Sequence, residues 1–230
     1  DKRRQTILNT IREQEQLTPE LEEKIEKAQS MQELEDLYLP YKPKKRTRAT
    51  KAREKGLEPL ADMLMKQQDE APATTARDYL SEEVEDVEQA LAGARDIIAE
   101  RVNEHRQARE RIRKLFHREA LIESRVAKGK EEEGDKYKDY FEWSELLRKT
   151  PSHRYLALLR GENEGILKIK IEPEKEEALA ILEELFLKNQ NASARQVKEA
   201  IEDSYKRLMA PSLENEIKNY YKEQADDESI

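Results

Sequence analysis

DVEQALAGARDIIAERVNEHRQARERIRKLFHREALIESRVA, residues 86–127, is the stretch that decides the fold class. Its apolar residues recur every three or four positions, so they gather on one side of a 100°-per-residue wheel. That side carries Ala94, Ile97, Ile98, His105, Ala108, Ile112, Leu115 and Phe116. The pattern predicts a long helix from about Asp86 to Ala127, in which His105 packs in the core.

Apolar residues recur at helical spacing before and after this stretch as well. The spacing of apolar residues changes from this pattern only once. Residues 155–159 (YLALL) and 166–171 (ILKIKI) flank a glycine-containing segment, and isoleucine recurs in the second run. Isoleucine and an alternation of apolar residues with lysine favour strands. We therefore expect a mainly α fold, a multi-helical array of about eight to eleven helices, with one small β-hairpin near 154–171.

Changes in pattern along the chain predict three regions. Residues 1–128 form an N-terminal helical region that includes a basic segment at 38–56. A charged and aromatic linker follows at 129–150, and residues 151–230 hold the hairpin and the C-terminal helices. The first residues enter helical pattern at once without an initiator methionine, so we expect the chain to be a piece of a longer protein.

Composition argues against several classes of function. The 230 residues include no cysteine, and the three histidines are dispersed, so we expect neither a disulfide nor a metal site. No glycine-rich phosphate loop appears, and the glutamate runs look like solvated surface. We expect no catalytic residues, no cofactor and no enzyme activity. No apolar run approaches the roughly 20 residues that span a bilayer, so we expect no membrane partner and a cytoplasmic protein.

One segment contradicts the acidic character of the chain. The formal net charge is -8, yet residues 41–55 hold eight basic residues and one acidic residue. Lysine and arginine near phosphates release condensed counterions, and neighbouring tyrosines can stack on unpaired bases. The candidate nucleic-acid contacts are Tyr41, Lys42, Lys44, Lys45, Arg46, Arg48, Lys51 and Arg53.

A structural interpretation of the same segment is equally consistent with the sequence. The cations would then pair with acidic helices of the same protein, and Tyr38 and Tyr41 would be buried anchors. For a second basic stripe, Arg106, Arg109 and Arg113, we favour intramolecular pairing with nearby Glu104, Glu110 and Glu119.

Five blocks of sequence resemble the Tex family of bacterial transcription accessory proteins, which are relatives of a eukaryotic transcription elongation factor. They are LEDLYLPYKPKKRTRATKAREKGLEPLA (34–61), REALIESRVAKGKEEEG (118–134), YKDYFEWSE (137–145), PSHRYLALLRGENEGILKIKI (151–171) and RLMAPSLENEIK (207–218). The first and fourth blocks are long and distinctive.

The resemblance implies a helical N-terminal region with helix-turn-helix character, in a protein that supports transcription by binding DNA or RNA. In the family a ribonuclease-H-like YqgF domain, helix-hairpin-helix elements and an OB-fold RNA-binding domain follow, and we find none of their patterns here. The implied partners are nucleic acid and, through it, the transcription machinery. The alternative is a scaffold that positions those other domains or docks a protein.

Overall fold

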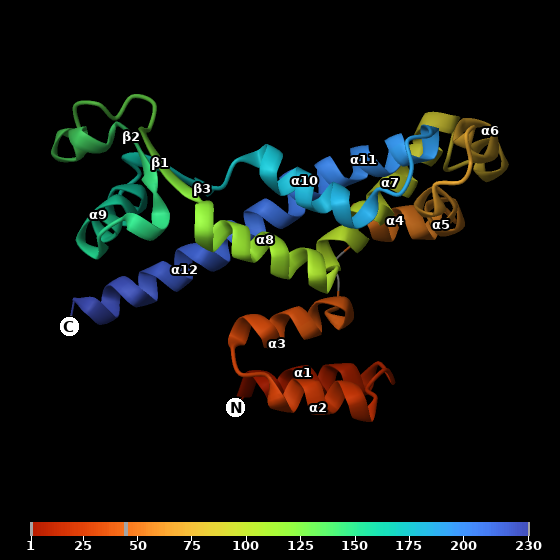
Figure 1. Ribbon diagram of the computed structural model, residues 1–230, viewed down its shortest axis with the longest axis horizontal. Coiled ribbons are helices and arrows are strands. Elements are labelled where there is room, and N and C mark those ends of the chain that lie inside the picture. The colour runs from red at the N-terminus through yellow and green to blue at the C-terminus, as the bar shows by residue number, and fades with distance from the viewer. Residues whose placement is uncertain (1, 44–45, 230) are drawn as a thin grey trace. The chain divides into compact units, whose positions relative to one another are not determined.

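The computed structural model describes residues 2–43 and 46–229 and is mainly α-helical, as predicted (Figure 1). The chain divides into two compact units. Unit 1 comprises residues 1–107 and 189–197, and unit 2 comprises residues 108–188 and 198–230. The three-region division expected from the sequence stays a prediction.

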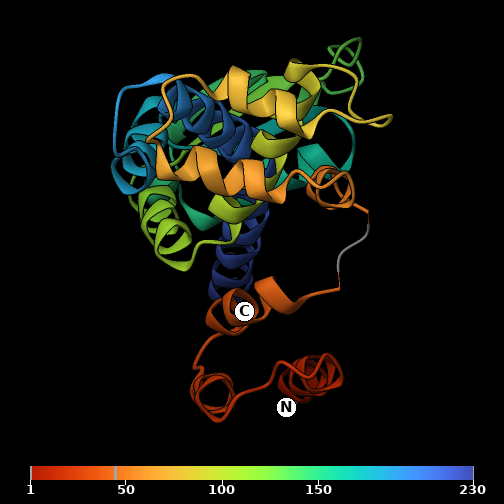
Figure 2. The ribbon, with the colours of Figure 1, turned by 90° about the vertical axis from the view of Figure 1, so that its right-hand side faces the viewer.

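Unit 1 begins with three helices that share a small apolar core. They are α1 (Lys2–Glu13), α2 (Pro19–Lys27) and α3 (Met31–Tyr38), with a 3-10 turn, η1 (Leu39–Tyr41), after the third. Thr18 and Ser30 cap α2 and α3 by accepting hydrogen bonds from Leu21 N and Glu33 N. The three helices lie side by side in both views (Figures 1 and 2), because Ile7, Ile11, Ile25 and Leu34 are buried together.

The rest of unit 1 packs around one central helix. Its elements are α4 (Arg48–Glu54), α5 (Glu58–Lys66), α6 (Pro72–Ala76), η2 (Arg77–Tyr79) and α7 (Val87–Glu104). Helices α4, α5 and α6 all contact α7. A distant segment completes the unit: Asn189 and Asn191 donate side-chain hydrogen bonds of 3.1 and 2.7 Å to Gln67 O, and Ser193 Oγ donates to Asp69 O.

Unit 2 combines a small sheet with long helices. Its elements are α8 (Arg106–Glu119, from Ala108 on), β1 (Leu121–Val126), η3 (Asp135–Tyr140), β2 (Glu142–Leu146), η4 (Leu147–Lys149), α9 (Ser152–Asn163), β3 (Leu167–Glu172) and α10 (Lys175–Phe186). Helix α11 (Ala192–Asp203), which belongs to unit 2 from Lys198 on, continues through a π-helical turn, η5 (Ser204–Met209), into α12 (Ala210–Glu228). The strands are antiparallel in the order β2-β1-β3.

The long helix predicted over 86–127 is wrong in two places. It breaks at His105, which adopts an extended conformation and is exposed rather than packed in the core. The break adjoins the unit boundary, so α7 and α8 bury their apolar stripes in different units. The pattern also changes at Leu121, where Ile122 is buried while Glu123 and Arg125 are exposed. This period of two suits β1, and pairing with two strands overrides helix propensity.

The predicted hairpin is half correct. Residues 167–172 form β3 as expected, but its partner is β1, and residues 155–159 belong to α9. Tyr155, Leu158 and Leu159 are buried at helical spacing, so the apolar run is a helix stripe. The expected linker likewise contains β2. Pro211 lies within a continuous helix because the π turn precedes it, although we expected it to start a new one.

The described part of the chain lacks a membrane-spanning helix and a metal-binding group of side chains. None of its helices is long and apolar enough to cross a membrane. Nor do its histidines, aspartates and glutamates form any group of three that could hold a metal ion.

Candidate nucleic-acid interface

The two tyrosines at the start of the basic segment are anchors of the α1–α3 core. Tyr38 is 5 % exposed, and the guanidinium of Arg3 lies 5.2 Å from its ring centroid. Arg3 is held in turn by Glu35, with Nε 2.5 Å from Oε1. Tyr41 is partly buried against the same cluster, and its carbonyl oxygen accepts a hydrogen bond from Gln14. This arrangement matches the anchoring interpretation rather than free stacking surfaces.

Helix α4 carries the second half of the basic segment. Thr47 caps it by accepting a hydrogen bond of 3.1 Å from Thr50 N. Ala49 and Ala52 are buried on one side, where α4 contacts α7. Arg48, Lys51 and Lys55 are exposed and spaced by three and four residues, so they share one helix face.

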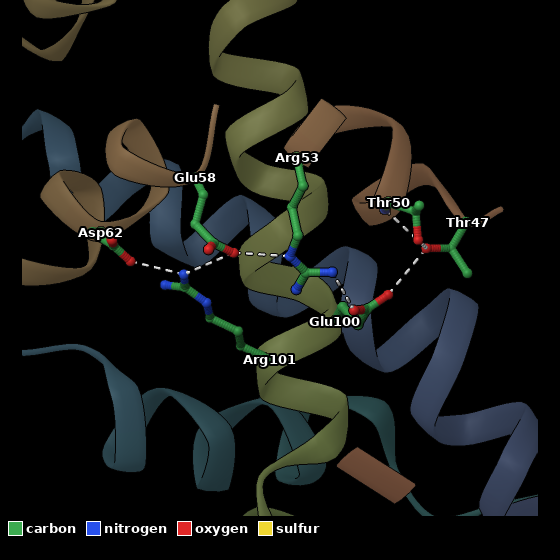
Figure 3. Close-up of polar contacts among 7 residues, drawn as sticks. All are labelled: Thr47, Thr50, Arg53, Glu58, Asp62, Glu100 and Arg101. Carbon is green, nitrogen blue, oxygen red and sulfur yellow. Dashed lines mark hydrogen bonds and ion pairs between the residues drawn. The ribbon is translucent and has the colours of Figure 1, made fainter. Parts of the chain in front are cut away.

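A buried carboxylate fixes the orientation of α4 (Figure 3). Glu100 on α7 is 7 % exposed and accepts hydrogen bonds from Arg53 and from the capping Thr47, at 2.9 and 3.1 Å. Both ends of α4 are thereby tied to one side chain.

The ion-pair network extends from Arg53 along α5 (Figure 3). Arg53 Nε donates to Glu58 at 2.8 Å, and Arg101 bridges Glu58 and Asp62 at 3.6 and 2.7 Å. Burial disfavours the charged form of Arg53, but its hydrogen bonds to Glu58 and Glu100 outweigh burial and raise its pKa. Arg53 is therefore committed to internal contacts.

The seven predicted cationic contacts fall into three groups. Arg46 and Arg53 have carboxylate partners, with Arg46 at 2.6 Å from Glu54 in an exposed pair. Lys42, Arg48 and Lys51 are exposed, with no ion pair to any residue in 2–43 or 46–229. Lys44 and Lys45 lie outside the described residues.

The exposed face of α4 borders a groove of about 290 Å³. Arg48, Lys51 and Lys55 line one side of it. Glu83, Gln89 and Asp96, on α7 and the segment before it, line the other. A polyanion would be attracted to the cations of α4 and repelled by Glu83 and Asp96, so any contact would run along α4 and not into the groove.

Two participants were missed by sequence reasoning. Lys55 completes the exposed stripe one turn after Lys51, and its spacing from Arg48 was a usable signal. Glu100 was the second, and its signal was a single carboxylate inside the apolar run IIAERV at residues 97–102. A charge at that position is buried only when it is paired.

Arg109 and Arg113 of the α8 stripe have their contacts inside unit 2, whereas Arg106 is exposed and belongs to unit 1. Arg109 is 5 % exposed and donates to Ser212 at 3.0 Å. Arg113 binds both oxygens of Glu216 at 2.6 and 3.2 Å. The intramolecular interpretation is confirmed for these two arginines, but these partners lie on α12 rather than one turn away on α8.

Comparison with known proteins places the chain in a family. A family model described as Tex central region-like matches residues 67–230, more than two thirds of the chain. The chain belongs to the Tex family. This confirms the resemblance drawn from the five sequence blocks.

Relatives in this family align with the whole chain. It is 43 % identical to YdcI of Bacillus subtilis, 40 % identical to YhgF of Escherichia coli and 38 % identical to the transcriptional accessory protein Tex of Neisseria gonorrhoeae. Each alignment covers 100 % of the chain but only 31–33 % of the relative. The chain thus spans about a third of the length of these relatives.

Proposed function

We propose that this Tex-family region is a non-catalytic nucleic-acid-binding scaffold of a cytoplasmic, transcription-associated protein, and that α4 contacts the phosphate backbone. The observation that carries the proposal is the difference among neighbouring cations. Arg46 and Arg53 are held by carboxylates, whereas Arg48, Lys51 and Lys55 project together from one face without an ion pair to any described residue. Such a face gains affinity by releasing counterions, with little dependence on sequence.

The test is fluorescence anisotropy with labelled single- and double-stranded DNA and RNA over a salt series. We compare the chain with a variant carrying Arg48→Glu, Lys51→Glu and Lys55→Glu. Three phosphate contacts contribute about 2.7 to the slope of log affinity against log salt on B-DNA, so fourfold more salt weakens binding about 40-fold through them. The variant should lose that part of the slope.

A matched control reverses the same number of charges elsewhere in unit 1. Lys24, Lys66 and Arg77 are exposed, and changing all three to glutamate gives the same net charge. Binding that weakens equally in both variants would refute a specific contact along α4.

A purely structural role is the second candidate, and the Glu100 network favours it. A helix fixed at both ends by one buried carboxylate is suited to hold neighbouring domains or a protein partner in place. If the chain binds no nucleic acid at low salt, where electrostatic attraction is strongest, this scaffold role replaces the first proposal.

A further inference from the structure

Unit 2 carries an aromatic cluster that extends to its surface. The ring of His117 on α8 lies 4.9 Å from that of Tyr220 on α12, edge to face. Tyr221 lies 5.2 Å from Tyr220 and 6.2 Å from the buried Tyr155 on α9. The inner rings are held by packing, so the outer ring is presented from a fixed base.

Tyr220 is the outer member of this cluster. It is 39 % exposed and is one of three large hydrophobic side chains that the described residues leave exposed. Its neighbour His117 is half-buried, and burial lowers the pKa of the imidazole, which Arg113 lowers further while Glu216 opposes the change. At neutral pH the cluster therefore presents uncharged aromatic rings.

Cations on η4 and α8 border the cluster. Arg148 on η4 donates through Nε to the carbonyl of Arg118 at the end of α8, at 2.9 Å. Arg148 also lies close enough to Tyr221 to lower the pKa of its phenol, although burial, the larger effect, raises that pKa. Lys114 is exposed one turn before His117 and Arg118.

We propose that Tyr220, in a cluster bordered by Arg148 and Lys114, is a binding site for unpaired bases of single-stranded nucleic acid. Every base has a face that stacks on an aromatic ring, and the adjacent cations attract the phosphates on either side. Bases inside a duplex are already stacked on both faces, so this site prefers single strands. It goes beyond the proposed function, because it lies in unit 2 and depends on stacking rather than on α4.

The experiment compares two oligonucleotides of about 12 units, one of thymidines and one with the same backbone but no bases. The whole chain should bind the thymidine strand roughly tenfold more tightly. Tyr220→Leu keeps an apolar side chain without a π face and should abolish the difference, whereas Tyr220→Phe should preserve it. Circular dichroism verifies that both variants are folded.

Two further variants separate this site from α4. The triple glutamate variant of α4 should weaken both oligonucleotides equally and leave their ratio unchanged. Glu223→Gln removes an exposed carboxylate one turn after Tyr220 and should tighten binding of both.

Three results would overturn the proposal. Equal affinity of the unmodified chain for the two oligonucleotides is one, and an unchanged ratio in Tyr220→Leu is another. The third is that the chain binds neither strand at low salt. In that case sedimentation should be compared between the parent and Tyr220→Leu, and loss of self-association in the variant would make the cluster a contact between copies of the chain.

Discussion

Replacing Glu100 with glutamine should loosen α4 from α7. Glutamine keeps an acceptor oxygen for Arg53, and its NH₂ group can donate to the hydroxyl oxygen of Thr47, so the substitution removes the negative charge that pairs with Arg53. Removing one partner of a fully buried ion pair costs about 3–5 kcal/mol. Arg53 is about a third exposed and keeps Glu58, which reduces the expected cost to roughly 2–3 kcal/mol.

Hydrogen exchange followed by mass spectrometry reports this loss locally. If α4 opens with the network, its amides should exchange roughly 30- to 150-fold faster in Glu100→Gln. Trp143, the only tryptophan, lies in unit 2, so its fluorescence checks that this unit is unchanged by the substitution in unit 1.

Glu54→Gln is the matched control, because it removes the exposed partner of Arg46 on the same helix. Exposed pairs contribute about 0–1 kcal/mol, so its exchange should change little. The reasoning about Glu100 is wrong if the two variants exchange at the same rate.

Two further predictions concern unit 2. Burial holds the pKa of His117 below its usual value. The contribution of His117 to stability is therefore complete above about pH 6.5 and is lost as pH falls through the lower folded-state pKa. NMR titration should show the low midpoint, and His117→Gln should remove that part of the pH dependence. Gly161→Ala would place Cβ 2.4 Å from Leu167 Cδ1, so an overpacking cost of about 1–3 kcal/mol should exceed the helix-propensity gain of at most about 1 kcal/mol. Urea unfolding followed by Trp143 fluorescence measures this change, and an alanine variant as stable as the parent would contradict the close packing.

Local patterns predicted the helices that have clear caps and stripes. Thr18, Ser30 and Asp86 each accept a hydrogen bond from the first turn of the helix they precede. The fold class followed from such signals, and the family followed from five sequence blocks.

The errors occurred where distant partners decided the structure. LIESRV can form a helix or a strand, and pairing on both sides selects the strand. YLALL could not be distinguished from a buried strand by its own residues. Arg109 and Arg113 have partners more than 100 positions away, and that distance conceals such pairs from any local rule.

The sequence locates a basic segment but does not separate its exposed cations from its ion-paired ones. Sequence shows that residues 41–55 are basic, yet only the position of α7 shows that Arg53 is bound by Glu100 while Arg48 and Lys51 face outward. Whether Arg48 and Arg53, five residues apart, are exposed or ion-paired depends on which side of α4 meets the core.

The asparagines that complete unit 1 bear on the order in which the chain folds during synthesis. Gln67 and Asp69 are made early, but Asn189, Asn191 and Ser193, which bond to their backbones, come more than 120 residues later. At a translation rate of about 5–20 residues per second, the partners of these carbonyls are synthesised roughly 6–25 s after them. The first part of unit 1 therefore emerges from the ribosome without these hydrogen bonds, and they can form only after most of unit 2 has been translated.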